Sequence, residues 1–166
     1  TGVQTCALPI FGNTLKDFRE NLKTGISGRE KADHSVIEGH AFPPVFPLRK
    51  FNPRPYGTHL LDPFIQYAVA ATEQAMEDAR FDMSAVDPYD ISLSVSSSKG
   101  GVHSLGRFKE RFVRNPSAIL GARMYTSAVP NFADQWIARR MRVQGPAKCY
   151  VAACATGTVA IVQGFR

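Results

Sequence analysis

The chain has 166 residues, of which 44% are apolar and 20% are charged, and this composition is that of a globular protein rather than of a disordered segment. No apolar run approaches the length of about eighteen residues that a transmembrane helix needs, so none is expected. The net charge of +6 favours an acidic partner, but the basic residues are scattered and no run of them predicts a nucleic-acid-binding arm.

The first residues of the chain are unusual. Residues 1–10 read TGVQTCALPI, which resembles the translation of a common short-read sequencing adapter, and they carry no signal-peptide pattern. We therefore predict that the natural sequence begins near Phe11; the alternative is a natural strand that ends at Pro9. Because the chain also stops at Arg166, inside an apolar and helix-like run, we expect residues 11–166 to be a domain truncated at both ends.

Two helices are predicted in the first half of the chain. The first covers Thr14 to Lys23, where Thr14 and Asp17 resemble a capping box and Gly25 provides a stop. Residues 26–61 are rich in proline and glycine and predict a long irregular segment. The second helix begins at Asp62 and Pro63, as cap and first turn. Its predicted packing face consists of Phe64, Tyr67, Ala68, Ala71, Ala75 and Ala79.

The second half alternates predicted strands and helices. A strand is expected over 90–98, followed by a small-residue turn at 96–101, whereas residues 103–128 fit no single pattern. A helix is expected over 131–143, stopped by Gly145 and Pro146, with its apolar positions at helical spacing. A short apolar strand over 149–153 then leads into a final helix. This order predicts an α/β fold.

The segment around Cys154 is the chemically informative one. A cysteine at the turn from a buried strand into a helix lies beside the positive end of the helix, which favours the thiolate. Small neighbours, Ala153, Ala155 and Gly157, leave room for a substrate. The alternative is a buried structural cysteine, and Cys149 is assigned that role. The three cysteines are an odd number without zinc-ligand spacing, which favours a reducing compartment such as the cytoplasm.

Four segments in order carry a family resemblance. GPAKCYVAACATGT, which ends around Cys154, resembles the nucleophile segment of the β-ketoacyl-acyl carrier protein synthases. Gly12-Asn13-Thr14 with FRENLKTGISG resembles the first helix of that family, and DPFIQYA with Glu77-Asp78-Ala79 resembles its second. Val129-Pro130-Asn131 resembles the stretch ahead of the nucleophile. The resemblance covers residues 11–166.

The resemblance implies a thiolase-like layered αβαβα fold, of which this chain would be the incomplete first half. It implies a decarboxylative Claisen condensation in fatty-acid elongation, with Cys154 as the acylated residue and acyl carrier protein as the partner. It further implies a homodimer and no organic cofactor or catalytic metal. The two catalytic histidines of the family would lie beyond Arg166, so His34, His40, His59 and His103 match none, and the isolated chain is expected to be inactive.

Some residues at the family's functional positions depart from its pattern, and others match it. Lys99 takes the place of an apolar acyl-pocket residue, so that either its amine reaches water or the pocket takes a shorter or more polar acyl group. Met124 and Tyr125 match the segment that reaches across the family's dimer into the partner's pocket. His59-Leu60-Leu61 replaces basic carrier-docking residues, and Arg80 replaces a helix-stopping glycine.

Other functions have less support in the sequence. The unusual turn at Lys99 would suit a ketosynthase of a polyketide or specialised-lipid pathway. A cysteine hydrolase would need a partner histidine, and no histidine here has a supporting motif. A subunit like a chain-length factor would lack the nucleophile. A nucleic-acid-binding module would need a larger basic face than Arg139, Arg140 and Arg142 supply.

Overall fold

The computed structural model describes residues 14–27, 29, 48, 51–117 and 121–165. The chain divides into two compact units with their boundary between Asn52 and Pro53. The proposed adapter, residues 1–10, and most of the expected irregular segment lie outside the described residues.

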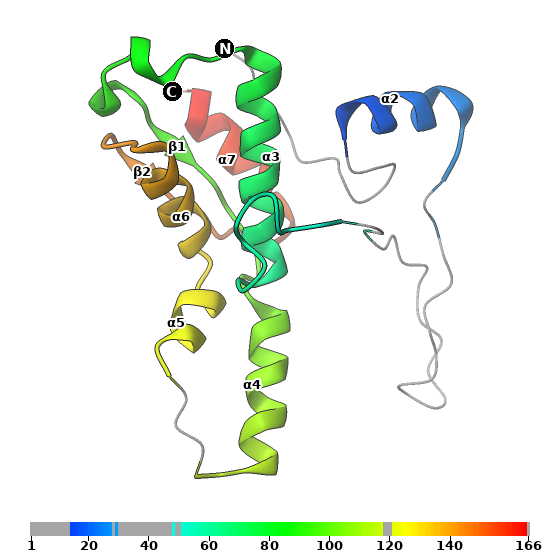
Figure 1. Cartoon of the computed structure of the whole chain (residues 1–166), viewed down its shortest axis with the longest axis vertical. Coiled ribbons are helices and arrows are strands. Elements are labelled where there is room, and N and C mark those ends of the chain that lie inside the picture. Colours follow the sequence, from blue (N-terminus) through cyan, green and yellow to red (C-terminus); the bar gives the residue numbers. More distant parts are fainter. Residues whose placement is uncertain (1–13, 28, 30–47, 49–50, 118–120, 166) are drawn as a thin grey trace. The chain divides into compact units, whose positions relative to one another are not determined.

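The described helix of the first unit is α2, Leu15–Thr24 (Figure 1). The Thr14 hydroxyl accepts a hydrogen bond from the Asp17 N–H at 3.1 Å, which is the predicted N-cap. Gly25 ends the helix at φ +70°, a left-handed conformation that glycine adopts without steric cost. The predicted helix is therefore confirmed.

The core of the second unit lies between two helices, α3 (Pro63–Ala79) and α6 (Phe132–Met141). Asp62 caps α3 as predicted, since its carboxylate accepts from the Phe64 N–H at 3.2 Å. The predicted packing face of α3 is confirmed in part, because Phe64 and Ala68 pack against the core. The buried core residues themselves are Ile65 and Val69 of α3 with Ala133 and Ile137 of α6. Of the other predicted residues, Tyr67, Ala71 and Ala75 are half-buried and Ala79 is exposed.

Of the two strands in the described residues, β1 (Leu93–Ser94) is shorter than the predicted strand over 90–98, and β2 (Ala147–Lys148) lies ahead of the predicted strand over 149–153, which is therefore wrong. The two strands pair in parallel, with Leu93 opposite Ala147. The start of the first predicted strand is instead a 3₁₀ helix, η3 (Pro88–Asp90). A two-stranded ladder has little stability of its own, and here it ends before Cys149. Beyond the ladder, the Tyr150 N–H donates to the Ser96 hydroxyl at 2.9 Å.

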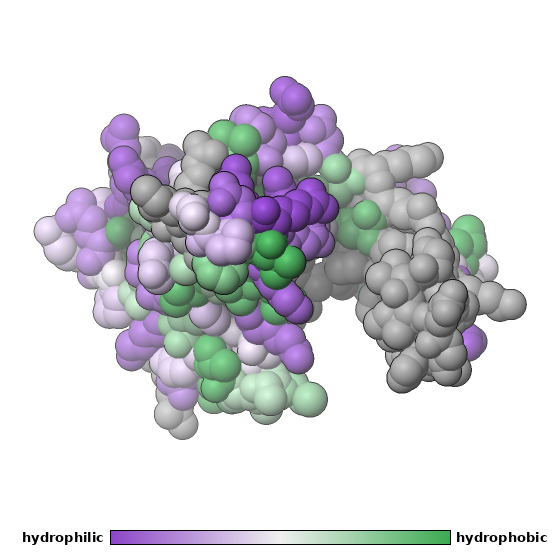
Figure 2. All heavy atoms as spheres, turned by 90° about the horizontal axis from the view of Figure 1, so that it is seen from below, coloured by the Kyte–Doolittle hydropathy of each residue, from purple (hydrophilic) through white to green (hydrophobic). Residues whose placement is uncertain are grey.

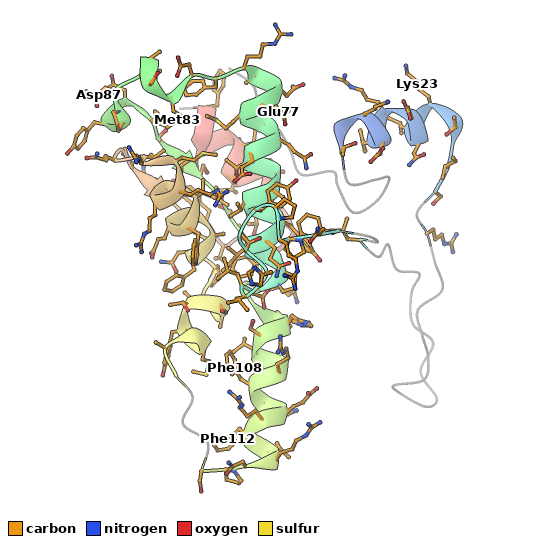
Figure 3. The ribbon with its side chains drawn as sticks, viewed as in Figure 1. Lys23, Glu77, Met83, Asp87, Phe108 and Phe112 are labelled. Atoms are coloured by element: carbon orange, nitrogen blue, oxygen red, sulfur yellow. The ribbon has the colours of Figure 1, made fainter. Side chains whose placement is uncertain are left out.

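The segment without a sequence assignment folds into two helices, α4 (Val102–Arg114) and α5 (Arg123–Ala128). Phe108 and Phe112 lie one turn apart on α4 (Figure 3). The remaining elements are η2 (Met83–Ala85), η4 (Ala153–Ala155) and α7 (Thr156–Phe165). The space-filling view shows apolar side chains at the surface among polar ones (Figure 2). Those of α4 include Val102, Leu105, Phe112 and Val113.

Two helices of the second unit, α3 and α6, end on an arginine with left-handed backbone. Arg142 has φ +56° and ends α6 before the predicted stop at Gly145. Gly145 instead allows a close approach of two backbone segments, because a Cβ at this position would lie 2.2 Å from the Ile91 carbonyl oxygen. Arg80 has φ +50° at the end of α3. This conformation explains why a glycine suits the position of Arg80.

Replacing Arg80 with glycine is expected to stabilise the protein. A left-handed residue with a Cβ carries a steric cost that glycine avoids, and the gain is about 1 kcal/mol after the entropy of glycine is subtracted. Chemical denaturation of Arg80→Gly against the unsubstituted protein measures the gain. Arg80→Ala removes the same charge but keeps the Cβ, so an equal gain in that control would contradict the explanation.

Candidate functional site

Cys154 lies in the turn that leads into α7. It is the central residue of η4, Ala153–Ala155, and its side chain is exposed. Ala153, just before it, has φ +46°, which an L-residue with a Cβ rarely adopts. Such backbone strain persists only where the surrounding structure enforces it, and it is concentrated at functional sites. The cysteine is thus presented at a sharp turn before a helix, as expected, although the preceding residues 149–152 form no regular strand.

The turn around Cys154 is closed by local hydrogen bonds. The Ala152 N–H donates to the Thr156 hydroxyl at 2.9 Å, and the Ala155 N–H donates to the Ala152 carbonyl at 2.9 Å. Thr156 is buried, with 5% of its surface exposed. This role of Thr156 was not predicted from the sequence. The signal available was a hydroxyl residue at the first position of the helix after the cysteine.

α7 is anchored to β1 rather than lying free. The Ser94 hydroxyl donates to the Ala160 carbonyl at 2.9 Å, in the middle of α7. A ten-residue helix carries partial positive charge at its N-terminus. Cys154 stands two residues ahead of that N-terminus.

The turn at 96–101 contacts the segment that leads to Cys154. Ser96 accepts from Tyr150, as described above, and the Gly100 N–H donates to the Ser97 hydroxyl at 3.0 Å. Lys99 lies in this turn with an exposed side chain. The other end of the turn contacts the end of α5, because the Gly101 N–H donates to the Ala128 carbonyl at 3.0 Å.

The two other predicted pocket residues lie on α5. Met124 is half-buried, and Tyr125 has 60% of its surface exposed. The structure therefore brings the turn that carries Lys99 next to the helix that carries these two residues. Of the histidines, His59 and His103 are described and both are exposed. His34 and His40 fall outside the described residues.

Cys149 has a different environment from Cys154. Its side chain is half-buried, and burial raises the pKa of its thiol; a backbone hydrogen bond from Ser97 opposes this, and the charge of Asp134 adds to it. Asp134 has only 3% of its surface exposed, and burial raises the pKa of its carboxyl against the opposing hydrogen bond from the Gln135 N–H. A raised pKa leaves less thiolate, which agrees with the structural role predicted for Cys149.

The described residues hold no group of three or more His, Cys, Asp or Glu side chains arranged to bind a metal ion. Within the same ranges, no helix combines the length and the apolar character needed to cross a bilayer.

Residues 5–166 match the family model described as "Beta-ketoacyl synthase, N-terminal domain". The chain is 25% identical over 164 residues to 3-oxoacyl-[acyl-carrier-protein] synthase 2 of Staphylococcus aureus. The aligned part covers 96% of this chain and 41% of the relative. The chain thus spans about 40% of the length of the curated relatives that it matches.

Two solved structures show the likeness of fold. A β-ketoacyl synthase from Burkholderia phymatum superposes with a TM-score of 0.74 at 22% identity, over 92% of this chain and 39% of that one. A type II polyketide ketosynthase, solved in complex with its acyl-carrier protein, superposes with a TM-score of 0.66 at 16% identity, over 91% of this chain and 41% of that one.

Proposed function

Because this chain belongs to the β-ketoacyl synthase family and has a partial thiolase-like fold, both as its sequence predicted, we propose that it is the N-terminal part of a longer condensing enzyme. That enzyme is an acyltransferase of fatty-acid elongation, and Cys154 carries the acyl group. The observation that carries the proposal is the exposed Cys154 at a strained turn before α7, inside the segment that resembles the family's nucleophile motif.

The proposed reaction has two steps. The Cys154 thiolate attacks the thioester carbonyl of an acyl-carrier protein, and a new thioester forms on Sγ. The bond between the acyl carbonyl carbon and the carrier sulfur breaks, and the carrier protein leaves as its free thiolate. In the second step malonyl-carrier protein loses carbon dioxide, and the resulting carbanion attacks the acyl-enzyme carbonyl. The bond to Sγ then breaks and the thiolate is restored. The family resemblance assigns the Cys154 N–H as one oxyanion donor.

The partner proposed for this reaction is an acidic acyl carrier protein. The chain's net charge of +6 supports an acidic partner, and a structurally similar ketosynthase was solved with its own carrier protein.

We also propose a homodimer in the cytoplasm. Exposed apolar residues on α4 and the exposed Tyr125 support a partner surface in this part of the chain. The isolated 166-residue chain is expected to be inactive.

The test of the function is a condensation assay on the full-length protein. Purified enzyme is mixed with acyl- and malonyl-carrier protein, and the 3-oxoacyl product is identified by mass spectrometry. The proposal fails if carbon dioxide is not released and no product two carbons longer appears.

A second candidate is a ketosynthase of a polyketide or specialised-lipid pathway, which the unusual Lys99 turn favours. Repeated extension without reduction of the product would identify that activity.

Replacing Lys99 with isoleucine is expected to shift the enzyme toward longer saturated acyl groups. An alkyl chain that covers the ammonium leaves a charge without water, which is costly, whereas isoleucine adds apolar surface. Each buried methylene contributes about 0.8 kcal/mol, so a few methylenes change relative rates by more than about tenfold. The measurement is the acyl-transfer rate against chain length for both proteins. Identical profiles would show that the Lys99 amine stays in water away from the acyl group.

A further inference from the structure

Asp62 binds the N-termini of two helices at once. Its Oδ1 accepts from the Phe64 N–H of α3 at 3.2 Å, and its Oδ2 accepts from the Ser104 N–H of α4 at 2.7 Å. In Figure 1 the start of α4 lies next to the start of α3. The carboxylate is buried, with 3% of the residue's surface exposed. Both of its oxygens are therefore used, and the charge lies where two helix dipoles favour it.

α4 has no other side-chain cap. Its N-cap residue is Gly101, which has no side chain, and no side-chain cap hydrogen bond is formed there. The first N–H groups of a helix have no partner inside the helix and need an external acceptor. Asp62 supplies that acceptor from 42 residues earlier in the chain, so the position of the start of α4 depends on Asp62.

The start of α4 is also the end of the turn at 96–101. Gly101 is buried against the end of α5, and a Cβ there would lie 1.7 Å from the Ser127 carbonyl oxygen. At its other end the turn contacts the nucleophile segment through Ser96, which accepts from the Tyr150 N–H at 2.9 Å. A continuous path of contacts thus runs from Asp62 through α4 and the turn to the segment that carries Cys154.

We propose that Asp62 is a positioning residue, which holds the turn at 96–101 against the nucleophile segment by capping α3 and α4 together. This proposal rests on the proposed function, because holding the turn matters only if Cys154 must be presented to an acyl thioester. Asp62 touches neither the substrate nor the sulfur. Its effect passes through α4 and Ser96.

The test uses two variants of the full-length protein, Asp62→Ser and Asp62→Asn. Serine and asparagine rank with aspartate as N-caps, so both retain an acceptor for Phe64 of α3. The serine hydroxyl is too short to serve both helices, and the asparagine amide has one acceptor oxygen and a donor group in place of the second. Both variants therefore lose the Ser104 contact. The matched control is Asp87→Asn, because Asp87 is an exposed cap that accepts from one helix start, the Tyr89 N–H at 2.9 Å.

Two measurements decide the outcome, both at a temperature where circular dichroism shows the variants to be folded. Hydrogen exchange of the Ser104 amide and of the residues 96–101 should become about 10- to 100-fold faster, as for loss of a hydrogen bond to a charged group. The rate of acyl transfer to Cys154 should fall by about tenfold. The Asp87→Asn control should change neither.

Unchanged acyl transfer in folded variants would overturn the proposal, because Asp62 would then contribute stability alone. Failure of both variants to fold would also overturn it, since Asp62 would then support the whole unit rather than the turn. If the unsubstituted protein does not acylate Cys154, the proposed function fails instead. The exchange measurement needs no activity and still reports whether Asp62 holds the turn.

Discussion

Replacing Cys154 with alanine in the full-length protein is expected to abolish formation of the acyl-enzyme. The alanine side chain has no nucleophile, and loss of a covalent nucleophile lowers turnover by more than about a thousandfold. Cys154 is exposed at its turn, so the change removes no core packing and the fold should persist. The measurement is the intact mass of the protein after incubation with an acyl-carrier protein thioester, followed by peptide mapping of the acylated residue.

The matched control is Cys149→Ala, which removes the other described cysteine. Burial raises the pKa of the Cys149 thiol, so this residue supplies less thiolate than an exposed cysteine would. The control variant should acylate at the normal site. Acylation of Cys154→Ala at another residue, or loss of acylation in Cys149→Ala with the fold intact, would refute the assignment of Cys154.

Replacing Gly101 with alanine is expected to destabilise the protein by about 3 kcal/mol, at the upper end of the usual cost of overpacking a close contact. The added Cβ would lie 1.7 Å from the Ser127 carbonyl oxygen and 2.9 Å from the Ala128 Cα. These atoms belong to the backbone, so they move only if the end of α5 shifts away from the turn. The loss is measured as a lower midpoint of urea denaturation at unchanged slope.

The same substitution one turn further along α4 should have the opposite effect. A Cβ at Gly106 meets no atom within 4 Å, and this glycine is exposed inside the helix. Alanine there gains about 1 kcal/mol of helix propensity. Gly106→Ala should therefore raise the midpoint of denaturation. Two glycine variants that shifted the midpoint in the same direction would show that the contact with Ser127 does not decide the role of Gly101.

Local signals in the sequence determined where several elements begin and end. Thr14 and Gly25 bound α2, and Asp62 with Pro63 begins α3, because a cap acts on the N–H and carbonyl groups of its own chain neighbourhood. The family was also recognisable from short ordered motifs, and the motif around Cys154 predicted this residue as the one that is acylated. These are properties of consecutive residues, so no knowledge of the rest of the fold was needed.

The tertiary structure decided what distant segments do to one another. The second oxygen of Asp62 accepts from Ser104, Ser96 accepts from Tyr150, and Gly101 accommodates the backbone of Ser127. The buried face of α3 was likewise set by α6, which selects Ile65 and Val69. None of these pairings has a signature in the spacing of residues, because each depends on which surfaces meet after the chain has folded. The sequence by itself therefore determined the family and predicted Cys154 as the nucleophile, and only the packing of α3, α4 and α6 decided how the turn at 96–101 is held.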